Sequence, residues 1–292
     1  MSTASARSPA GIILARLWRI SPMLVVGGLI LLVVALACAG APALTSADPI
    51  KTRLGDRLTP PLGLGGTSTH LLGTDNLGRD IWARVLYGGR LSLILAAGSV
   101  ILAAASGVVL GLMSGFAGGG VDDLIMRAAD VQLAFPVLML AIAIIAVVGT
   151  SPLAIVGVLA LNGWVIYART LRASVLSIRQ LEYVEAARAQ GATAPRIVVR
   201  HVLPNAMAPL LVLASAQFGT MVLLESGLSF LGLGVQPPQP SWGNMLAEGR
   251  DYLSNAWWLG TVPGAAIALI VLGANLLGDG VRKVLDPWLR RR

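Results

Sequence analysis

Apolar runs that hold no charged residue recur along this chain, and their lengths restrict what it can fold into. A helix needs roughly 17–25 mainly apolar residues to cross the hydrocarbon core of a bilayer. Only 12% of the residues are charged, whereas soluble domains average about 25%. The sequence therefore predicts an all-α membrane protein and excludes a soluble globular domain. The runs lie at 22–40, 91–115, 131–168, 208–224 and 261–277.

The run at 131–168 is too long for one span. It is interrupted by Gly149-Thr150-Ser151-Pro152, and clusters of this composition mark loops. We therefore expect two spans here, the first of them kinked at Phe135-Pro136. The run at 22–40 follows three arginines, as a secretory signal would, but it is too long for a signal core and is expected to stay as an uncleaved span. The total is about six transmembrane helices.

Lysine and arginine are distributed unevenly between the segments that connect these runs. If the N-terminus is inside, the inner segments hold 15 of these residues and the outer segments hold 7. Segments rich in lysine and arginine stay in the cytoplasm, so both termini are expected to be cytoplasmic. The predicted organisation is a cytoplasmic tail at 1–21, a first helix with an extracytoplasmic segment at 22–90, a transmembrane core at 91–281 that includes a cytoplasmic loop at 177–206, and a cytoplasmic tail at 282–292.

Several classes of function are poorly supported. The net charge of +8 would suit nucleic acid, but the basic residues cluster beside apolar runs as topology signals do, so we expect no nucleic-acid partner. Cys38 is the single cysteine, and His70 and His201 are the only histidines, which is too few for a metal site or a nucleophile–base pair. No Gly-Lys-Ser/Thr motif of a P-loop occurs. We expect no enzyme activity and no catalytic, metal or cofactor-binding residue on this chain.

The outer segment before the second span has its own predicted element. Glycines and Pro60-Pro61 mark irregular loop in its first part. Asp80 and Arg84, separated by apolar residues, favour a surface-lying helix that ends near Gly88-Gly89. The second span is then expected to begin at Leu91.

A polar island at 182–205 separates the fourth and fifth spans. Residues 182–190 are nearly all good helix formers. Gly191 is expected to provide a left-handed cap where this helix stops. Thr193 is expected to cap a second short helix, which Pro204 closes. Two short helices joined by a glycine are thus predicted at the membrane surface.

The charges of this island are spaced for helical faces. Glu185 and Arg188 lie one turn apart on the first helix, and Arg196 and Arg200 share a face of the second. A short basic helix held off the membrane is suited to lie in the groove of a partner protein.

The same residues carry a resemblance to a known family. Glu185-Ala186-Ala187, three residues, Gly191 and then Leu203-Pro204 resemble the cytoplasmic signature of ABC importer permeases. His201, an aliphatic residue and Leu-Pro-Asn are similar to the peptide-transporting branch. Most specifically, the chain resembles the C-type inner-membrane subunit of dipeptide/oligopeptide importers. The coupling residues that the resemblance implies are Glu182, Glu185, Ala186, Ala187, Arg188, Gly191, Arg196, Arg200, His201, Leu203 and Pro204.

The resemblance also implies partners and a mechanism. It implies a multi-pass permease of the bacterial inner membrane, paired with a homologous second permease, two ATP-binding subunits that carry ATP and Mg, and an extracytoplasmic solute-binding protein. ATP-driven closure of those subunits would move the docked loop. The expected solutes are di- or oligopeptides, with nickel, glutathione or another small solute as alternatives. From a different class, an ion-coupled secondary transporter would need intramembrane charges and usually inverted repeats.

Two polar residues in the predicted spans are candidates for the solute pathway. Glu225 lies at the expected outer end of the fifth span, where an acid can simply reach water, although intramembrane acids also mark transport pathways. Asn162 in the fourth span is expected to form an interhelical hydrogen bond, with solute contact as the alternative. His201 is expected to be structural.

Overall fold

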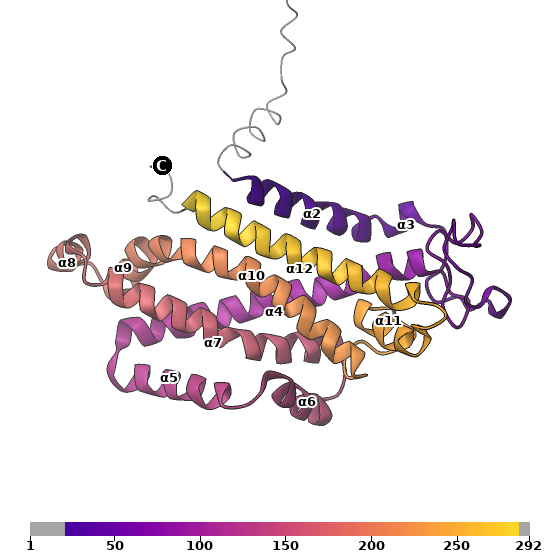
Figure 1. The fold of residues 1–292 in the computed structure, drawn as a ribbon. Coiled ribbons are helices and arrows are strands. Elements are labelled where there is room, and N and C mark those ends of the chain that lie inside the picture. The colour runs from indigo at the N-terminus through magenta and orange to yellow at the C-terminus, as the bar shows by residue number, and fades with distance from the viewer. Residues whose placement is uncertain (1–20, 286–292) are drawn as a thin grey trace, which may run out of the picture.

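The structure is a computed structural model and describes residues 21–285. Within these residues it is helical, without a strand; one isolated bridge joins Thr74 and Asp80. Figure 1 shows the elements. In chain order they are α2 (Pro22–Ala39), α3 (Ala41–Leu44), η1 (Leu54–Asp56), α4 (Ile81–Ala117), α5 (Gly119–Leu133), α6 (Val137–Val148), α7 (Pro152–Ile178), α8 (Glu182–Ala189), α9 (Ala194–Ile197), η2 (Val198–Val202), α10 (Leu203–Phe230), α11 (Trp242–Gly249), η3 (Arg250–Tyr252) and α12 (Trp258–Leu285).

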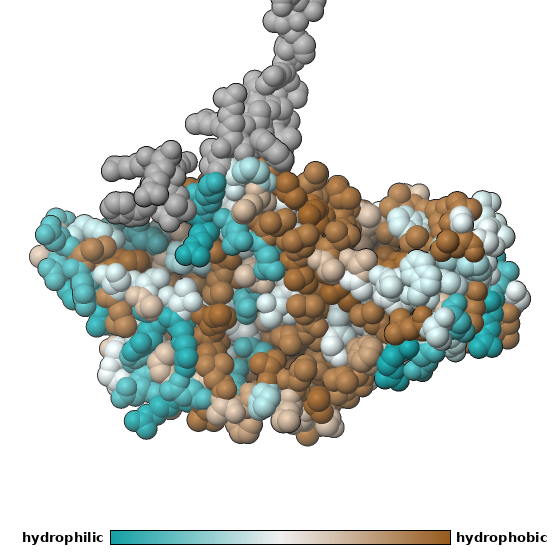
Figure 2. All heavy atoms as spheres, in the orientation of Figure 1, coloured by the Kyte–Doolittle hydropathy of each residue, from teal (hydrophilic) through white to brown (hydrophobic). Residues whose placement is uncertain are grey.

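The long helices run side by side and give the molecule two distinct ends (Figure 1). We call one the α8 end, which carries α8 and α9, and the other the α11 end, which carries α3, the segment 45–80 and α11. Helix α2 begins and α12 ends at the α8 end. Figure 2 shows a hydrophobic band around the middle, with hydrophilic surface gathered towards both ends. This distribution is the one that a bilayer requires.

The number of spans agrees with the sequence. Five helices are long and apolar enough to cross a membrane, and the pair α5 and α6 adds a sixth if it is one span. The two helices of this pair meet at 93°, so Phe135-Pro136 does not merely kink a helix. Pro136 takes an extended conformation ahead of α6, because a proline ring cannot continue the preceding helix. The segment 116–130, between the second and third apolar runs, is largely helix α5.

Small residues bring the spans together. A Cβ atom added to Gly107 of α4 would lie 2.5 Å from the Cβ of Tyr167 and 2.6 Å from the carbonyl oxygen of Trp164 in α7. A Cβ atom on Gly27 of α2 would lie 2.4 Å from the backbone nitrogen of Leu277 in α12. Such close backbone approach is the usual way in which membrane helices pack.

The prediction of a separate surface helix before the second span is wrong. Helix α4 runs without a break from Ile81, with the Asp80 carboxylate accepting from the Ala83 N–H at 2.8 Å as its cap. Gly88 and Gly89 do not end it, because they lie where α4 meets other elements: a Cβ atom on Gly89 would be 2.4 Å from the Trp242 ring. The expected boundary between 90 and 91 therefore falls inside a helix.

The predicted tails lie almost entirely outside the described residues. Of 1–21, the structure describes Ser21, whose side chain accepts from the Leu24 N–H at 3.3 Å and caps α2. The expected start of the C-terminal tail at 282 falls within α12, which continues to Leu285.

Candidate functional site

Helix α8 ends in the turn that the sequence predicts at Gly191. The Gly191 N–H donates to the Arg188 carbonyl at 3.0 Å, and the Ala192 N–H donates to the Ala187 carbonyl at 3.0 Å. This pair of bonds is a Schellman motif, which needs a left-handed residue after the helix. Gly191 has φ +82°, and nothing lies within 4 Å of a Cβ atom placed on it. The backbone conformation, rather than crowding, therefore favours glycine here.

The second helix differs from its prediction at both ends. Thr193 stands at the start of α9, but its side chain makes no capping hydrogen bond. Pro204 does not close the helix, since the chain continues through η2, a π-helical turn, into α10. Proline lacks an N–H and its ring pushes away the carbonyl four residues earlier, and the wider π turn accommodates this with the Leu203 N–H bonded to the Val198 carbonyl.

The basic segment is continuous with a membrane-spanning helix and is not separate from it. Residues Ala194–Phe230 form one 37-residue helix that is apolar enough to cross a membrane. The basic turn with Arg196 and Arg200 is therefore a direct extension of a span, not a helix held off the membrane. Single π turns occur frequently at functional sites.

We use "coupling segment" for residues 182–205. Apolar side chains fix it to the bundle: Val184 of α8, Ile197 of α9 and Val202 are buried in one cluster. This cluster includes Leu171 and Val175 of α7. Because buried apolar residues hold the segment on the bundle, its charged side chains are not needed for this attachment and stay exposed.

The charged members of the coupling segment all face outwards. Glu182, Glu185, Arg188, Arg196 and Arg200 are exposed. Among residues 21–285, none of the five forms a salt bridge. Of the other predicted coupling residues, Ala186, Gly191 and Pro204 are exposed, and Ala187, His201 and Leu203 are half-buried.

His201 has the structural contact expected of it. Its ring lies 6.0 Å from that of Tyr183, centroid to centroid, at an angle of 52°. The Asn205 amide donates to the His201 carbonyl at 2.6 Å and to the Tyr183 hydroxyl at 3.3 Å. Tyr183 and Asn205 thus join α8 to the start of α10. Neither was predicted to matter, although both stand inside the polar island.

A bidentate ion pair joins α5 and α7 near the start of the coupling segment. Arg172 of α7 donates to both carboxylate oxygens of Asp122 in α5, at 2.5 Å each. Arg179, which follows α7, donates to the Gly115 carbonyl of α4 at 3.1 Å. Three helices are therefore tied together where the coupling segment begins.

A second charged cluster lies at the α11 end, and here the charges are buried. Arg79 and Arg84 both bind Asp75, at 2.6 and 2.7 Å, and both reach Glu248 of α11, at 2.7 and 3.0 Å. We call these four residues the paired cluster. Three of its side chains are at most 8% exposed. The sequence contained no periodic signal that joins Glu248 to residues 75–84, because the partners are distant in the chain.

Neighbouring side chains close the α11 end further. The His70 ring binds the Asp80 carboxylate at 2.8 Å. The indole of Trp242 donates to the Val85 carbonyl at 2.9 Å, and that of Trp258 donates to the Thr74 carbonyl at 3.1 Å. The loop before α4 is thereby held against α11 and α12.

Of the two pathway candidates, Glu225 lies deeper than expected. It is fully buried because α10 continues to Phe230 and the neighbouring helices cover it, so the prediction that it reaches water is wrong. Ser229 donates to one of its oxygens at 2.8 Å, and the other oxygen has no partner in the described chain. Asn162 makes the interhelical bond that was predicted, donating to the Val137 carbonyl of α6 at 3.4 Å.

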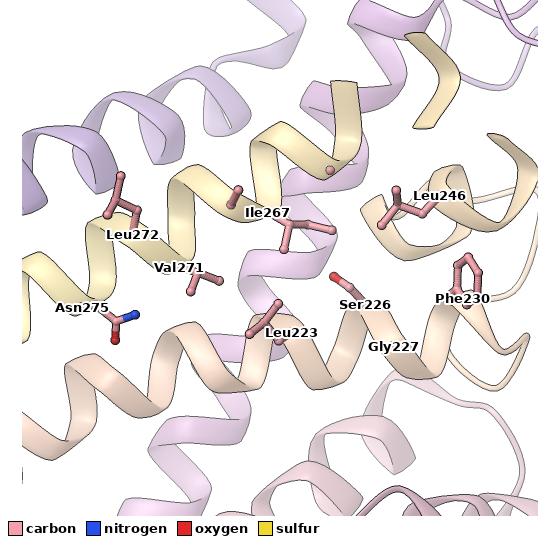
Figure 3. A pocket seen from close by; sticks show the side chains of 11 residues that line it. Leu223, Ser226, Gly227, Phe230, Leu246, Ile267, Val271, Leu272 and Asn275 are labelled. Atoms are coloured by element: carbon pink, nitrogen blue, oxygen red, sulfur yellow. The ribbon is translucent and has the colours of Figure 1, made fainter. Parts of the chain in front are cut away.

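An apolar groove of about 610 Å³ lies between α10, α11 and α12 (Figure 3). Leu223, Ile267 and Val271 project into it, and Ser226 and Asn275 are its polar members. Glu225 is not part of its lining. The groove therefore offers few polar side chains for contact with a solute.

Comparison with known proteins places these features in a family. Residues 107–291 match the family described as binding-protein-dependent transport system inner membrane component. The chain is 44% identical over 266 residues to the di/tripeptide transport system permease protein DppC of Pseudomonas aeruginosa, covering 90% of this chain and 88% of that protein. It is 43% identical over 229 residues to the glutathione transport system permease protein GsiD of Pectobacterium atrosepticum, covering 78% of this chain and 76% of that protein.

One solved structure also aligns with the fold. It is a crystal structure of an amino acid ABC transporter with histidines, with a TM-score of 0.49 and 20% identity over 72% of this chain and 94% of that chain. The family assignment rests on the sequence relatives.

Proposed function

The chain belongs to the family of binding-protein-dependent transport system inner membrane components, and we propose that it forms one half of the membrane pore of an importer for di- and oligopeptides. As an ABC importer permease it is a multi-pass protein of the bacterial inner membrane. In this proposal ATP and Mg are bound by two separate subunits, which dock on the coupling segment. A second, homologous permease completes the pore.

The docking proposal is supported by the division of the coupling segment into a buried apolar side and an exposed charged side. Its apolar residues are buried in the bundle while its five charged residues are exposed and unpaired among the described residues. Exposed charges of both signs on a well-anchored turn are suited to contact a partner protein. The continuous helix from Ala194 to Phe230 supports transmission of a movement from that partner into the membrane.

The distribution of basic residues supports a proposed orientation in the membrane. We place the α8 end in the cytoplasm, as the 15-to-7 distribution of basic residues favours. The start of α2 and the end of α12 lie at that end. The α11 end then faces outwards, where the loop at 231–241, which leads into α11, would meet a solute-binding protein or act as a lid.

Orientation is testable with single cysteines in a Cys38→Ala chain. Arg196→Cys should react with an impermeant thiol reagent only from the cytoplasmic side. Leu64→Cys, at an exposed position of the outer segment, should react only from outside. The reverse pattern would refute the orientation.

Peptide uptake tests the function directly. Cells that lack this chain but retain its partner subunits should not accumulate a radiolabelled dipeptide, and the restored chain should return uptake. Uptake should stop when ATP is depleted and continue when an uncoupler collapses the ion gradient. Dependence on the gradient instead would support an ion-coupled transporter and contradict the proposal.

Glutathione is the second candidate solute. The likeness to the glutathione permease GsiD, at 43% identity, favours it over nickel. Unlabelled glutathione should therefore be compared with unlabelled dipeptide as a competitor of dipeptide uptake. Stronger competition by glutathione would replace the peptide assignment while leaving the permease assignment in place.

A further inference from the structure

A cavity of about 380 Å³ lies on the face shared by α6, α7 and α10. It differs from the groove of Figure 3 in the number of polar side chains that border it. Its polar members come from two spans, Asn162, Arg169 and Thr170 from α7 and Gln217 and Thr220 from α10. The remaining lining is Leu133, Val137, Gly163, Val165, Ile166, Met221 and Leu224.

Some hydrogen-bond donors and acceptors of these side chains have no partner among the described residues. Asn162 donates once, to the Val137 carbonyl, and Thr220 donates to the Ala216 carbonyl of its own helix at 3.2 Å. Within residues 21–285, the carboxamide of Gln217 makes no hydrogen bond. Gln132 of α5 provides a contrast, because it donates to the Leu161 carbonyl at 2.6 Å and accepts from the Trp164 indole at 2.7 Å. Gln132 is thus a satisfied structural amide, and Gln217 is not.

Gln217 lies half way along α10, which is part of a helix long and apolar enough to cross a membrane. Its surroundings within the lining are tightly packed: a Cβ atom on Gly163 would lie 2.6 Å from the Met221 methyl group and 3.8 Å from the Gln217 amide nitrogen. Towards the α8 end, the cavity is bordered by Arg169, which is paired with Asp130 of α5. The carboxamide therefore borders a cavity in which five of the lining side chains are polar.

Lipid tails cannot satisfy a carboxamide, and leaving one without hydrogen bonds in an apolar medium is costly. The Gln217 face must consequently be covered by water, by solute or by a polar partner. A carboxamide presents a donor and an acceptor side by side. This arrangement is complementary to a peptide group, which also presents one N–H and one C=O.

We propose that this cavity is a contact point for the translocated peptide, in which Gln217 forms hydrogen bonds with a backbone peptide group and Asn162 provides a further acceptor. The proposal rests on the function proposed above and adds to it the solute class and the residues. It favours peptides over bare metal ions, because the lining offers amides and hydroxyls rather than a cluster of carboxylate, thiolate or imidazole ligands.

Accessibility to water is the first test. In the assembled transporter with Cys38→Ala, Gln217→Cys should react with a small, charged thiol reagent, and a transported dipeptide should slow the reaction. Leu32→Cys is the matched control, since Leu32 is 55% exposed on α2, the most apolar span, and should face lipid and stay unlabelled. No labelling at Gln217→Cys, or its disulfide cross-linking to the second permease, would show that a helix covers this face and would overturn the proposal.

Solute uptake is the second test. Gln217→Met keeps the side-chain size but removes the amide, and should lower dipeptide uptake at low concentration by about tenfold, the effect expected for hydrogen bonds worth about 1.4 kcal/mol together. Co-purification of the ATP-binding subunits should be unchanged. If the unaltered chain imports peptide and Gln217→Met imports it equally well, this inference is wrong while the proposed function stands. If the unaltered chain imports no peptide, the proposed function itself fails.

Discussion

The two ends of the molecule use the same residue types in opposite ways. At the α11 end, Arg79 and Arg84 are enclosed by Asp75 and Glu248, and all four charges are paired. In the coupling segment at the α8 end, arginine and glutamate are exposed, and within the described chain they find no ion-pair partner. Paired, buried charges fix one arrangement, whereas free, exposed charges are available to another protein.

The two ends are also held by different forces. Polar bonds that reach across the sequence close the α11 end, among them the indole donors of Trp242 and Trp258. The coupling segment is held mainly by buried apolar residues such as Val184 and Ile197. Apolar contacts are non-directional, so they allow a helix pair to shift under load. The α11 end is thus held by directional polar bonds, and the coupling segment mainly by apolar contacts.

Asp75→Asn should give the largest effect. The amide keeps the shape of the carboxylate but removes its charge, so Arg79 and Arg84 are left with Glu248 alone. Breaking a buried ion pair by removing one partner typically costs about 3–5 kcal/mol. We expect a loss of this size in the free energy of unfolding, measured by denaturant unfolding of the detergent-solubilised chain.

The matched control is the same chemical change at the other end. Glu185→Gln replaces an exposed acid that has no ion-pair partner among the described residues, so stability should change by no more than about 0.5 kcal/mol. Equal losses for both variants would remove the contrast between the ends.

Val184→Ala should have an intermediate, local effect. It removes two buried methyl groups, which corresponds to about 1.6 kcal/mol at roughly 0.8 kcal/mol per group. Backbone amides of α8 should exchange hydrogen faster, while those of α11 keep their protection. Faster exchange at both ends would mean that the ends are not independent.

The sequence alone predicted the features that depend on local chemistry. The apolar runs predicted the spans. Gly191 predicted the turn after α8, because the conformation of this turn depends on the glycine itself and not on distant contacts. The resemblance of the island to ABC importer permeases predicted the family to which the chain belongs, and the coupling role of the segment stays a prediction. Two predicted helix ends were nevertheless wrong. Pro204 does not end a helix, because a π turn accommodates it, and Gly88 and Gly89 lie inside helix α4.

Contacts between distant parts of the chain were not predictable in this way. Glu248 meets Arg84 only because α11 folds back onto α4. Glu225 appeared to lie at a helix end, but the extension of α10 and the packing around it bury the side chain. Gln217 had no pattern to distinguish it from a structural amide, and its open face became visible only beside Asn162.

Tyr183→Phe should give the smallest effect. It removes the hydroxyl that accepts from Asn205 at 3.3 Å and keeps the ring contact with His201. A hydrogen bond of this kind contributes about 0.5–1.5 kcal/mol, and a long, exposed one lies at the low end. Hydrogen exchange in α8 should rise slightly, less than in Val184→Ala. A larger rise than in Val184→Ala would show that polar contacts, not apolar ones, hold the coupling segment.

Docking on the coupling segment is the central claim, and co-purification of the ATP-binding subunits with solubilised variants tests it most directly. Gly191→Val should lose these subunits, because valine strongly disfavours φ +82°, while Gly191→Asn, which tolerates this conformation, should retain much of the binding. Gly149→Val is the matched control: Gly149 has φ +90° and equally open surroundings, but it lies between α6 and α7, outside the coupling segment. We expect full binding for Gly149→Val and little for Gly191→Val, with both chains inserted in the membrane. Retention of the ATP-binding subunits and of transport by Gly191→Val would contradict it.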